Sequence, residues 1–582
     1  VMMISDTRGW SGLPQFSRDM YQERYFLEGE NYRGWLDRMA KFADDDAMAE
    51  RIKTYIHNYW FMPSTPVSSN GNAPERGLPI SCYVNKTQDS KEGIFDTFTE
   101  NNWLGSYGGG IGTDWSSVRG IGEGVGANGK SSGIIPFIKV SDSSTLAVSQ
   151  GGLRRASQAV YLDVSHPEIE EFIDVRRPTG DANRRSLNVH HGVTIPDAFM
   201  EAVESRGQWD LISPKTGSIV KTVDAFDLFK KMLVTRMETG EPYMLFKDNV
   251  NDARPQVYKD AGYEVTQSNL CAEITLHTNE NYTGVCCLAS MNLEYWDEIE
   301  FELEQFVYDT TRFLDNVLQS FSDLTEGVPG FEKARRSAIA ERSLGLGAMG
   351  FHSLLQKKNL PWGSPMSKGL NITVFDKIKA AVDDANHEAA IKFGPCPLGE
   401  RYGHYIRNTH STSIAPTASI STLCNGTSQG VDPRLANSYV HKTNIGTYTQ
   451  RNKYLERRLI ELGANTDKVW KAIGKEAGSI QNLKIPGLSA WDKEVFKTAI
   501  ELNQFHTVDM ACDRAPYIDQ AQSINLFLPA DEQVANLYNL HVRAWKQGLK
   551  SLYYCRSTAA TRASAGLRDR EIIEVDSCLS CQ

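Results

Sequence analysis

Apolar residues recur at three- and four-residue intervals in two long stretches of the chain. The first lies between Trp35 and Trp60, and the second runs from Leu303 to Phe321. This spacing is the period of an amphipathic helix, so both stretches are predicted to be helical. The apolar positions of the first stretch are Met39, Phe42, Met48, Ile52, Tyr55 and Ile56.

Shorter apolar runs have the length of buried strands. They cover residues 134–140, 160–164 and 523–528. Prolines at 63 and 66 end the first helical stretch, and a loop-rich region with many glycines and serines follows to beyond residue 150. Strands that alternate with helices predict an α/β fold with a largely parallel sheet.

Composition narrows the class of protein. The chain has 582 residues, of which 41% are hydrophobic and 23% are charged, as expected for a globular protein. A net charge of −10 gives no general attraction to nucleic acid. No apolar run reaches the roughly 18 to 20 residues that a membrane span needs, and residues 1–10 lack a signal-peptide pattern. A cytoplasmic protein with neither a membrane nor a nucleic-acid partner is predicted.

One of the ten cysteines lies between an amide and a carboxylate. In an extended strand, Asn269, Cys271 and Glu273 would share one face, because alternate side chains point the same way. A thiol beside a hydrogen-bonding amide and a general base is a candidate reaction centre. A buried structural cysteine between two turn residues explains the same pattern about equally well.

Three further cysteines, Cys82, Cys286 and Cys287, lie in strand-like settings and could join one site. Metal binding is not predicted, because only Cys578 and Cys581 are spaced by two residues and a zinc site needs two such pairs. A pair of thiols on a mobile tail can instead reduce a buried disulfide by exchange and pass the oxidation to an external reductant.

The residues from Gly124 to Ser131 match the phosphate-loop pattern G-x-x-x-x-G-K-[ST]. That motif requires a buried strand before it and a helix after it, whereas here glycines precede it and Pro136 follows. A nucleotide hydrolase or nucleotide-binding module therefore stays a minor alternative. Arg119 and Lys130 could still contact a nucleotide, and a solvated surface loop is equally compatible with the sequence.

Six separated motifs, taken together and in order, resemble the large, catalytic subunit of ribonucleotide reductase. They are Pro63–Pro66, Ile80–Cys82, Asn269–Glu273, Ala415–Ser421, Leu552–Tyr554 and the terminal cysteine pair. The resemblance implies a ten-stranded α/β barrel of two antiparallel five-stranded halves with a finger loop inside. It divides the chain into N-terminal helices (1–62), the barrel (63–557) and a flexible redox tail (558–582).

The resemblance also implies a role for each cysteine of the site. Cys271 would become a thiyl radical that abstracts the ribose 3′ hydrogen, while Glu273 takes the 3′-hydroxyl proton and Asn269 hydrogen-bonds the substrate. Cys82 and Cys286 would protonate the leaving 2′-hydroxyl and supply two electrons, ending as a disulfide. Cys287 is expected to be structural, because it points to the opposite strand face. Cys578 and Cys581 would regenerate the pair.

Two groups of polar residues match nucleotide-binding positions of the family. Substrate phosphates would be bound by Thr65, Ser81, Thr417, Ala418, Ser419, Ile420 and Ser421, although a serine- and threonine-rich helix start would look the same. A deoxynucleoside triphosphate or ATP would act as a specificity effector at Asp89, Arg119 and Lys130. Gln150 and Arg154 would carry its signal to the substrate base.

Tyr553 and Tyr554 match the adjacent pair that relays a radical from a separate small subunit in class I enzymes. The resemblance therefore favours class I, with an adenosylcobalamin-dependent enzyme as the alternative. No cofactor is expected in this subunit itself. The expected partners are the small subunit, thioredoxin or glutaredoxin, and a second copy in a homodimer. With about sixty residues before Pro63, the N-terminal ATP cone of many relatives is expected to be absent.

Overall fold

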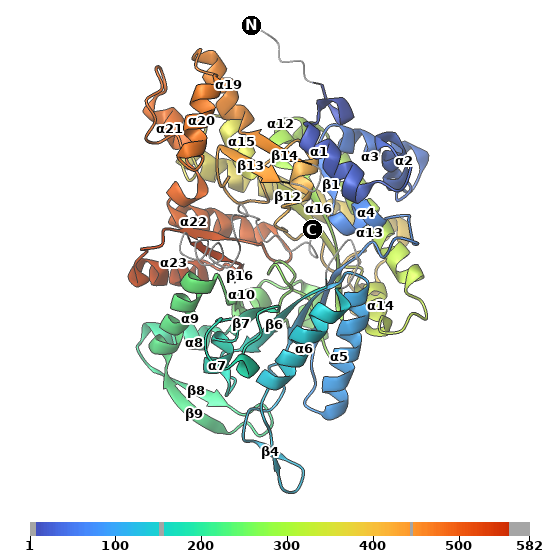
Figure 1. Cartoon of the computed structure of the whole chain (residues 1–582). Coiled ribbons are helices and arrows are strands. Elements are labelled where there is room, and N and C mark those ends of the chain that lie inside the picture. Colours follow the sequence, from blue (N-terminus) through green and yellow to red (C-terminus); the bar gives the residue numbers. More distant parts are fainter. Residues whose placement is uncertain (1–6, 150–155, 443–445, 558–582) are drawn as a thin grey trace.

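The computed structural model describes residues 7–149, 156–442 and 446–557 (Figure 1). Its first three α-helices are α1 (Gln15–Met20), α2 (Tyr32–Ala40) and α3 (Asp46–His57). The predicted helical stretch from Trp35 to Trp60 is thus two helices. The break arises because Asp45 caps α3, accepting the Met48 N–H at 2.8 Å, and so starts a new helix.

Five parallel strands form the first half of the main sheet. In spatial order they are β2 (Cys82–Lys86), β3 (Gly110–Asp114), β6 (Ser157–Asp163), β7 (His190–Ile195) and β10 (Tyr243–Phe246). Each strand is buried along most of its length, as parallel strands covered on both faces must be. The predicted strand at 160–164 is confirmed as β6.

The second half runs antiparallel to the first and adjoins it at both edges. Strand β11 (Gly284–Asn292) pairs antiparallel with β2, and β16 (Ser551–Leu552) pairs antiparallel with β10. Strand β12 (Leu344–Met349) is parallel to β11, and β15 (Leu526–Leu528) is parallel to β17 (Cys555–Ser557). Isolated parallel bridges join Leu346 to Thr412 and Ile414 to Gln522.

The sheet therefore contains two parallel sets of opposite direction, as the family resemblance implied and as the largely parallel sheet predicted from the residue pattern did not. One continuous sheet holds nine strands, counting the short β1 (Phe61–Pro63) that pairs with β11. The count of ten strands is not reproduced, because the chain at 412–414 and at 522 makes only single bridges among the described residues.

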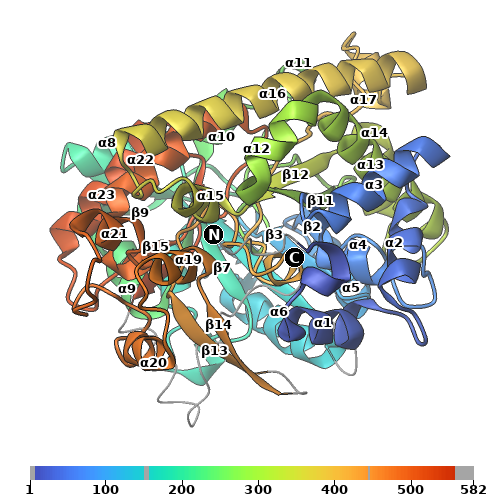
Figure 2. The same cartoon turned by 90° about the horizontal axis from the view of Figure 1, so that it is seen from above.

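Helices surround the sheet (Figure 2). The long helix α16 (Pro365–Phe393) packs against α13 (Leu303–Leu324) and α22 (Gln504–Arg514), and α22 also contacts α23 (Val534–Lys546). The predicted helix at 303–321 is confirmed as α13. Its apolar face is buried in a core that also contains Trp35 and Ile52 of the N-terminal helices. The three-part division of the chain stays a prediction.

The apolar run at 134–140 is helical, so its prediction as a strand was wrong. It begins helix α6 (Ile135–Val148), in which Pro136 occupies the first turn. Proline fits there because its missing N–H has no helical partner in any case. The buried residues Ile135, Ile138 and Asp142 follow helical spacing. Of the predicted strand at 523–528, only Leu526–Leu528 is strand.

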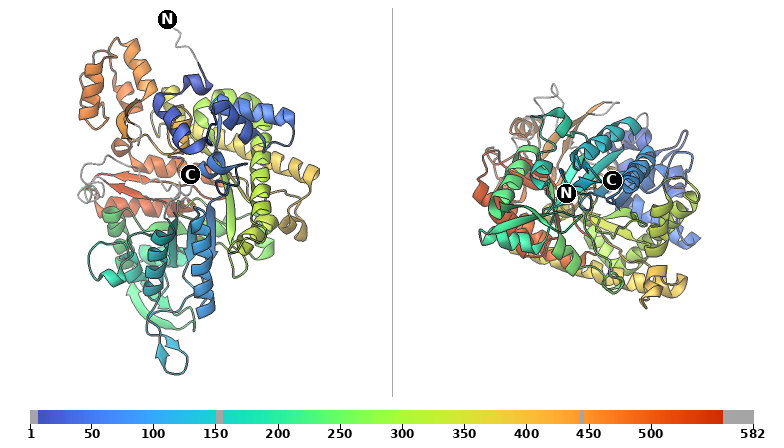
Figure 3. Two further views of the ribbon diagram at one scale, coloured as in Figure 1. Left: turned by 45° about the vertical axis from the view of Figure 1, so that its right-hand side comes forward. Right: turned by 90° about the horizontal axis from the view of Figure 1, so that it is seen from below.

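Three smaller units extend from this body (Figure 3). Helices α19 (Lys453–Glu461), α20 (Asp467–Lys475) and α21 (Ala490–Val495) have a hydrophobic core of their own. Two hairpins lie at the opposite end of the molecule in Figure 1: β4 (Gly124–Val125) with β5 (Gly129–Lys130), and β8 (Gln208–Ile212) with β9 (Ile219–Asp224).

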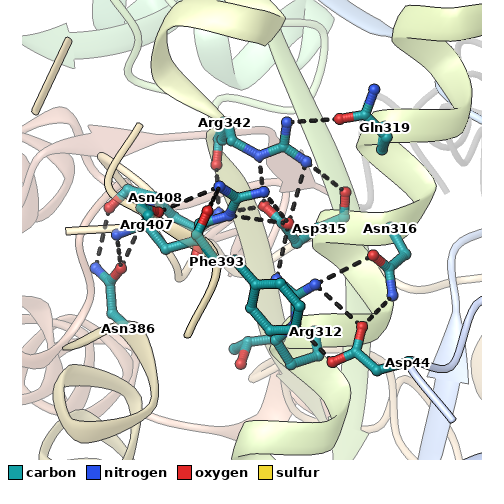
Figure 4. Close-up of polar contacts among 12 residues, drawn as sticks. Asp44, Arg312, Asp315, Asn316, Gln319, Arg342, Asn386, Phe393, Arg407 and Asn408 are labelled. Carbon is teal, nitrogen blue, oxygen red and sulfur yellow. Dashed lines mark hydrogen bonds and ion pairs between the residues drawn. The ribbon is translucent and has the colours of Figure 1, made fainter. Parts of the chain in front are cut away.

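A buried carboxylate connects α13 with the segments that precede β12 and residues 412–414 (Figure 4). Asp315 of α13 accepts hydrogen bonds from Arg312 and Arg342 at 2.8 Å and from Asn408 at 2.9 Å, and Arg407 lies 3.2 Å away. Burial opposes ionisation, but the three guanidinium groups outweigh it and lower the pKa of Asp315 to about 2. Because Arg342 precedes β12 and Asn408 precedes the 412–414 segment, this carboxylate fixes where both segments start.

Candidate active site

The loop of residues 266–276, here called the finger loop, lies between α11 (Gln256–Ala261) and β11. It is a turn rather than the predicted extended strand. The Asn269 side-chain oxygen accepts the N–H groups of Glu273 at 3.1 Å and Ile274 at 3.2 Å. Ala272 has a φ of 61°, which reverses the chain direction. The turn, not alternation along a strand, brings the amide, thiol and carboxylate together.

The finger loop lies inside the curled sheet and is held by both halves. From the first half, the Tyr161 hydroxyl donates to the Asn269 carbonyl at 2.6 Å. Gly112 of β3 approaches so closely that an added Cβ would lie 1.9 Å from the Ser268 carbonyl oxygen. From the second half, three serine hydroxyls donate to successive finger-loop carbonyls: Ser523 to Cys271, Ser551 to Ala272 and Ser413 to Glu273.

Cys271 contacts the first of the two predicted relay tyrosines. The Tyr553 hydroxyl lies 3.4 Å from Cys271 Sγ, and the rings of Tyr553 and Tyr554 are 4.2 Å apart between centroids. Both tyrosines lie between β16 and β17, where the chain passes from one strand to the next. Exposure rises outward from 0% at Cys271 through 1% at Tyr553 to 9% at Tyr554. The three side chains form a continuous path toward the surface.

Cys82 and Cys286 face each other across the two halves. They are directly opposite in the antiparallel pairing of β2 with β11, and both are buried. Burial holds the pKa of the Cys286 thiol well above its usual range, against a hydrogen bond from Gln520 at 3.4 Å. Cys287 lies in the main hydrophobic core, whereas Cys286 belongs to the cluster around Cys271. This placement agrees with a structural Cys287.

Several predicted phosphate-binding residues lie near the cysteine pair. A small cavity is lined by Ser64, Pro66, Ser81, Cys82 and Cys286 among others. Thr65, between two of those residues, shares a hydrogen bond with the Tyr25 hydroxyl at 3.0 Å. The segment 417–421 leads into the short helix α18 (Ile420–Leu423), which contacts β1 beside this cavity. Thr417 accepts the Gly430 N–H at 2.8 Å, while Ala418, Ser419 and Ser421 lie around the start of α18.

The predicted effector residues are brought together outside the barrel. Arg119 donates to Asp89 at 3.0 Å and to the Gly124 carbonyl at 2.7 Å, and Lys130 lies on the exposed hairpin strand β5. The phosphate-loop pattern is therefore a β4–β5 hairpin, with α6 starting only at Ile135. This is not the strand–loop–helix arrangement that a hydrolase loop needs. Gln150, Arg154, Cys578 and Cys581 lie outside the described residues.

Sequence reasoning missed a polar cluster beside Tyr554. His190, Glu241 and Arg176 come from separate segments and meet next to the phenol. It also missed Gln520 and the three serines that hold the finger loop. The only sign in the sequence was that polar residues gather at Gln520–Ser523, just before the apolar residues Leu526–Leu528.

Among the described residues, every helix is too short or too polar to span a membrane.

Comparison with known proteins identifies the family. The model of the ribonucleotide reductase barrel domain matches residues 80–401 and 398–555. A Frog virus 3 (isolate Goorha) protein, provisionally assigned as a ribonucleoside-diphosphate reductase large subunit, is 40% identical over 537 residues, covering 92% of each chain. The corresponding large subunit of Invertebrate iridescent virus 3 is 37% identical over 573 residues, covering 88% of each chain.

Among solved structures, the Actinobacillus ureae class Id ribonucleotide reductase alpha subunit superposes with a TM-score of 0.83 at 32% identity. The superposition covers 96% of this chain and 99% of that one. The chain belongs to the ribonucleotide reductase family, whose members reduce ribonucleotides to the deoxyribonucleotides needed for DNA. Within the family, its similarity is to the large, alpha subunit.

Proposed function

We propose that this chain is the catalytic subunit of a class I enzyme that reduces ribonucleoside diphosphates with a radical supplied by a separate small subunit. The contact between the Tyr553 hydroxyl and Cys271 Sγ is the observation that carries the proposal. A relay needs phenols within contact of the thiol it oxidises, and the adjacent Tyr554 extends that contact outward. The names of the viral large subunits support diphosphates as substrates.

The proposed reaction starts at the Cys271 sulfur. The thiyl radical takes a hydrogen atom from ribose C3′, and Glu273 accepts the proton of the 3′-hydroxyl. The 2′-hydroxyl then leaves as water with a proton from the Cys82 and Cys286 pair. The second hydrogen of the pair goes to C2′, so the pair gives up two electrons in all and becomes a disulfide. Glu273 returns its proton to the 3′ oxygen, and Cys271 returns its hydrogen atom to C3′. The two electrons from the cysteine pair reduce one ribonucleotide, so one disulfide is formed for each product molecule.

The positions of the side chains suit these roles. Two backbone N–H groups occupy the Asn269 side-chain oxygen, so the amide N–H groups are the part that would bind a substrate hydroxyl. Ser523 lies 3.4 Å from a Glu273 carboxylate oxygen. Substrate phosphates would bind beside Ser81, next to the cysteine pair, with Thr65 and residues 417–421 supplying further donors.

The class I proposal also includes a specificity effector, an external reductant and a second copy of the chain. A deoxynucleoside triphosphate or ATP would bind at Asp89, Arg119 and Lys130, and thioredoxin or glutaredoxin would reduce the tail. A homodimer is supported by exposed large apolar side chains on two adjoining helices, α5 (Lys91–Ser106) and α6. They are Phe95, Trp103, Val140 and Leu146. No cofactor is proposed to bind this subunit directly. A cytoplasmic location stays a prediction.

The test is reduction of labelled CDP by the chain with a candidate small subunit, compared with adenosylcobalamin alone. Deoxycytidine diphosphate formed only with the small subunit would support class I. Product formed with adenosylcobalamin and no partner would contradict class I and favour the alternative. ATP turnover without deoxynucleotide would contradict the proposed reductase activity altogether.

A further inference from the structure

The Tyr554 hydroxyl is close to a histidine that reaches the surface. It lies 3.4 Å from Nδ1 of His190, the first residue of β7. The His190 side chain is 26% exposed. The same Nδ1 atom also contacts Oε1 of the buried Glu241. One ring nitrogen thus faces both a phenol and a carboxylate.

The carboxylate of Glu241 is held ionised. Arg176 Nε lies 3.0 Å from its Oε2, His191 Nδ1 lies 3.1 Å from the same oxygen, and the Tyr243 hydroxyl donates to Oε1 at 3.2 Å. Burial favours the neutral acid, but the adjacent Arg176 charge outweighs it and, with the hydrogen bond from His191, holds the pKa of Glu241 well below its usual range. An ionised carboxylate in this position can accept a hydrogen bond from an Nδ1–H group.

Oxidation of Tyr554 requires its proton to leave. Burial and the nearby Glu241 hold the phenol protonated and raise its pKa, so the electron would leave a neutral phenol. The resulting cation would lie in a buried site with the Arg556 guanidinium 4.6 Å from the ring centre. A second positive charge there is unfavourable. Transfer of the proton in the same step removes that charge.

We propose that His190 accepts the phenolic proton of Tyr554 when the electron passes to the oxidised small subunit, and that Glu241 stabilises the imidazolium formed. This inference rests on the proposed class I function. The Tyr554 O–H bond breaks, an N–H bond forms at Nδ1, and the small-subunit radical gains the electron. Tyr554 becomes a neutral radical, which then takes a hydrogen atom from Tyr553, and Tyr553 takes one from Cys271.

The two contacts of Nδ1 fit the two states of this step. In the neutral ring with its hydrogen on Nε2, Nδ1 accepts a hydrogen bond from the phenol. Once protonated, Nδ1 donates to Glu241 instead. The acceptor is therefore stabilised only after the proton has arrived, which favours the radical state of Tyr554 over its resting state. When the radical returns to the small subunit, the proton moves back to the phenol.

Chemical rescue tests the inference. His190→Gly in the full chain, assayed with the small subunit, CDP and effector, should lower turnover roughly a hundredfold, the usual contribution of a positioned proton acceptor. Added imidazole should restore much of the rate, because the site opens to solvent. With Tyr554→3-aminotyrosine, which traps a radical, His190→Gly should lower the radical yield seen by electron paramagnetic resonance, and imidazole should raise it again.

Two control variants separate proton transfer from a structural effect. Tyr554→Phe should gain nothing from imidazole, because it has no proton to give. His191→Gln removes a neighbouring partner of Glu241 without touching Tyr554, so imidazole should not change its rate. Wild-type turnover in His190→Gly, or a loss that imidazole does not reverse while small-subunit binding persists, would overturn the inference. A wild type that needs no small subunit would overturn both proposals.

Discussion

The Tyr553 hydroxyl lies 3.4 Å from Cys271 Sγ although 282 residues separate the two in sequence. The contact joins the finger loop to the last described strands of the barrel, and the backbone N–H of Tyr553 is held by Ile524 at 2.9 Å. A hydrogen atom can move between these two side chains without either one being displaced. The pair therefore defines the inner end of the proposed relay.

Replacing Cys271 by serine should abolish deoxynucleotide formation. A hydroxyl occupies nearly the same space as the thiol, but its O–H bond is too strong for the relay to oxidise. Turnover of labelled CDP measures the loss, and equilibrium binding of CDP and effector should remain as in the wild type. Appreciable product from Cys271→Ser would exclude this residue as the radical site.

Tyr553→Phe should stop turnover while small-subunit binding persists. Phenylalanine keeps the ring packing against Tyr243 and Tyr554 but has no oxidisable hydroxyl. The measurement is CDP reduction alongside a binding titration of the small subunit. Tyr59→Phe is the matched control, because it removes a buried hydroxyl that donates to the Gly9 carbonyl rather than to Cys271. Equal rates of CDP reduction by Tyr553→Phe and the wild type would contradict the relay.

The cysteine pair in the barrel and the pair in the tail should have different roles in turnover. Cys82→Ser or Cys286→Ser should prevent even the first reduction, because this pair supplies the electrons to the substrate. Replacing both Cys578 and Cys581 by serine should leave about one product per prereduced chain and block further turnover with thioredoxin. A small dithiol that enters the barrel should restore it, because exchange needs only an accessible thiolate. Repeated turnover with thioredoxin alone would show that the tail pair is dispensable.

Asp315→Asn should destabilise the fold without altering the reactive cysteines. Removing the charge leaves three guanidinium groups without their shared partner, at a cost of about 3 to 5 kcal/mol in the free energy of unfolding. Denaturant titration measures this change. Asp323→Asn, at an exposed position of the same helix α13, is the control and should change stability little. Equal stability of the two variants would contradict the role of the cluster.

The same carboxylate predicts a pH dependence. The pKa of Asp315 is lowered from 3.8 to about 2 in the folded state, so its ionised form favours folding. The contribution, about 2 kcal/mol, is fully present above about pH 4 and is lost as the pH falls toward 2. Unfolding midpoints measured from pH 5 to 2 should fall less steeply in Asp315→Asn than in the wild type. The same pH dependence in both proteins would show that protonation of Asp315 is not linked to unfolding.

The sequence predicted the chemistry of the site better than its geometry. Cys271 with its two neighbours, the opposed pair Cys82 and Cys286, and the tyrosine pair all lie where one site requires them. The turn at Ala272 was missed, because a positive φ at a non-glycine residue leaves no mark in a pattern of apolar positions. The helix at Ile135 was missed because a short apolar run has no clear period.

Contacts between distant segments were beyond sequence reasoning for a different reason. Each serine that holds the finger loop is an ordinary polar residue in its own segment, and only the fold shows that three of them face successive carbonyls. His190 likewise belongs to a strand with no local sign of chemistry. Its significance comes from Tyr554, which lies 364 residues further along the chain.

The pairing of Cys82 with Cys286 has a mechanical consequence. These residues lie on the first strand of each half, at the seam where β2 meets β11. If each turnover oxidises the pair, each turnover also inserts a covalent crosslink between the two halves and reduction then removes it. The crosslink closes a loop of about two hundred residues, which by chain entropy alone stabilises a fold by roughly 5 kcal/mol. The catalytic cycle would thus alternate between a barrel whose two halves are covalently crosslinked and one whose halves are held together by non-covalent contacts alone.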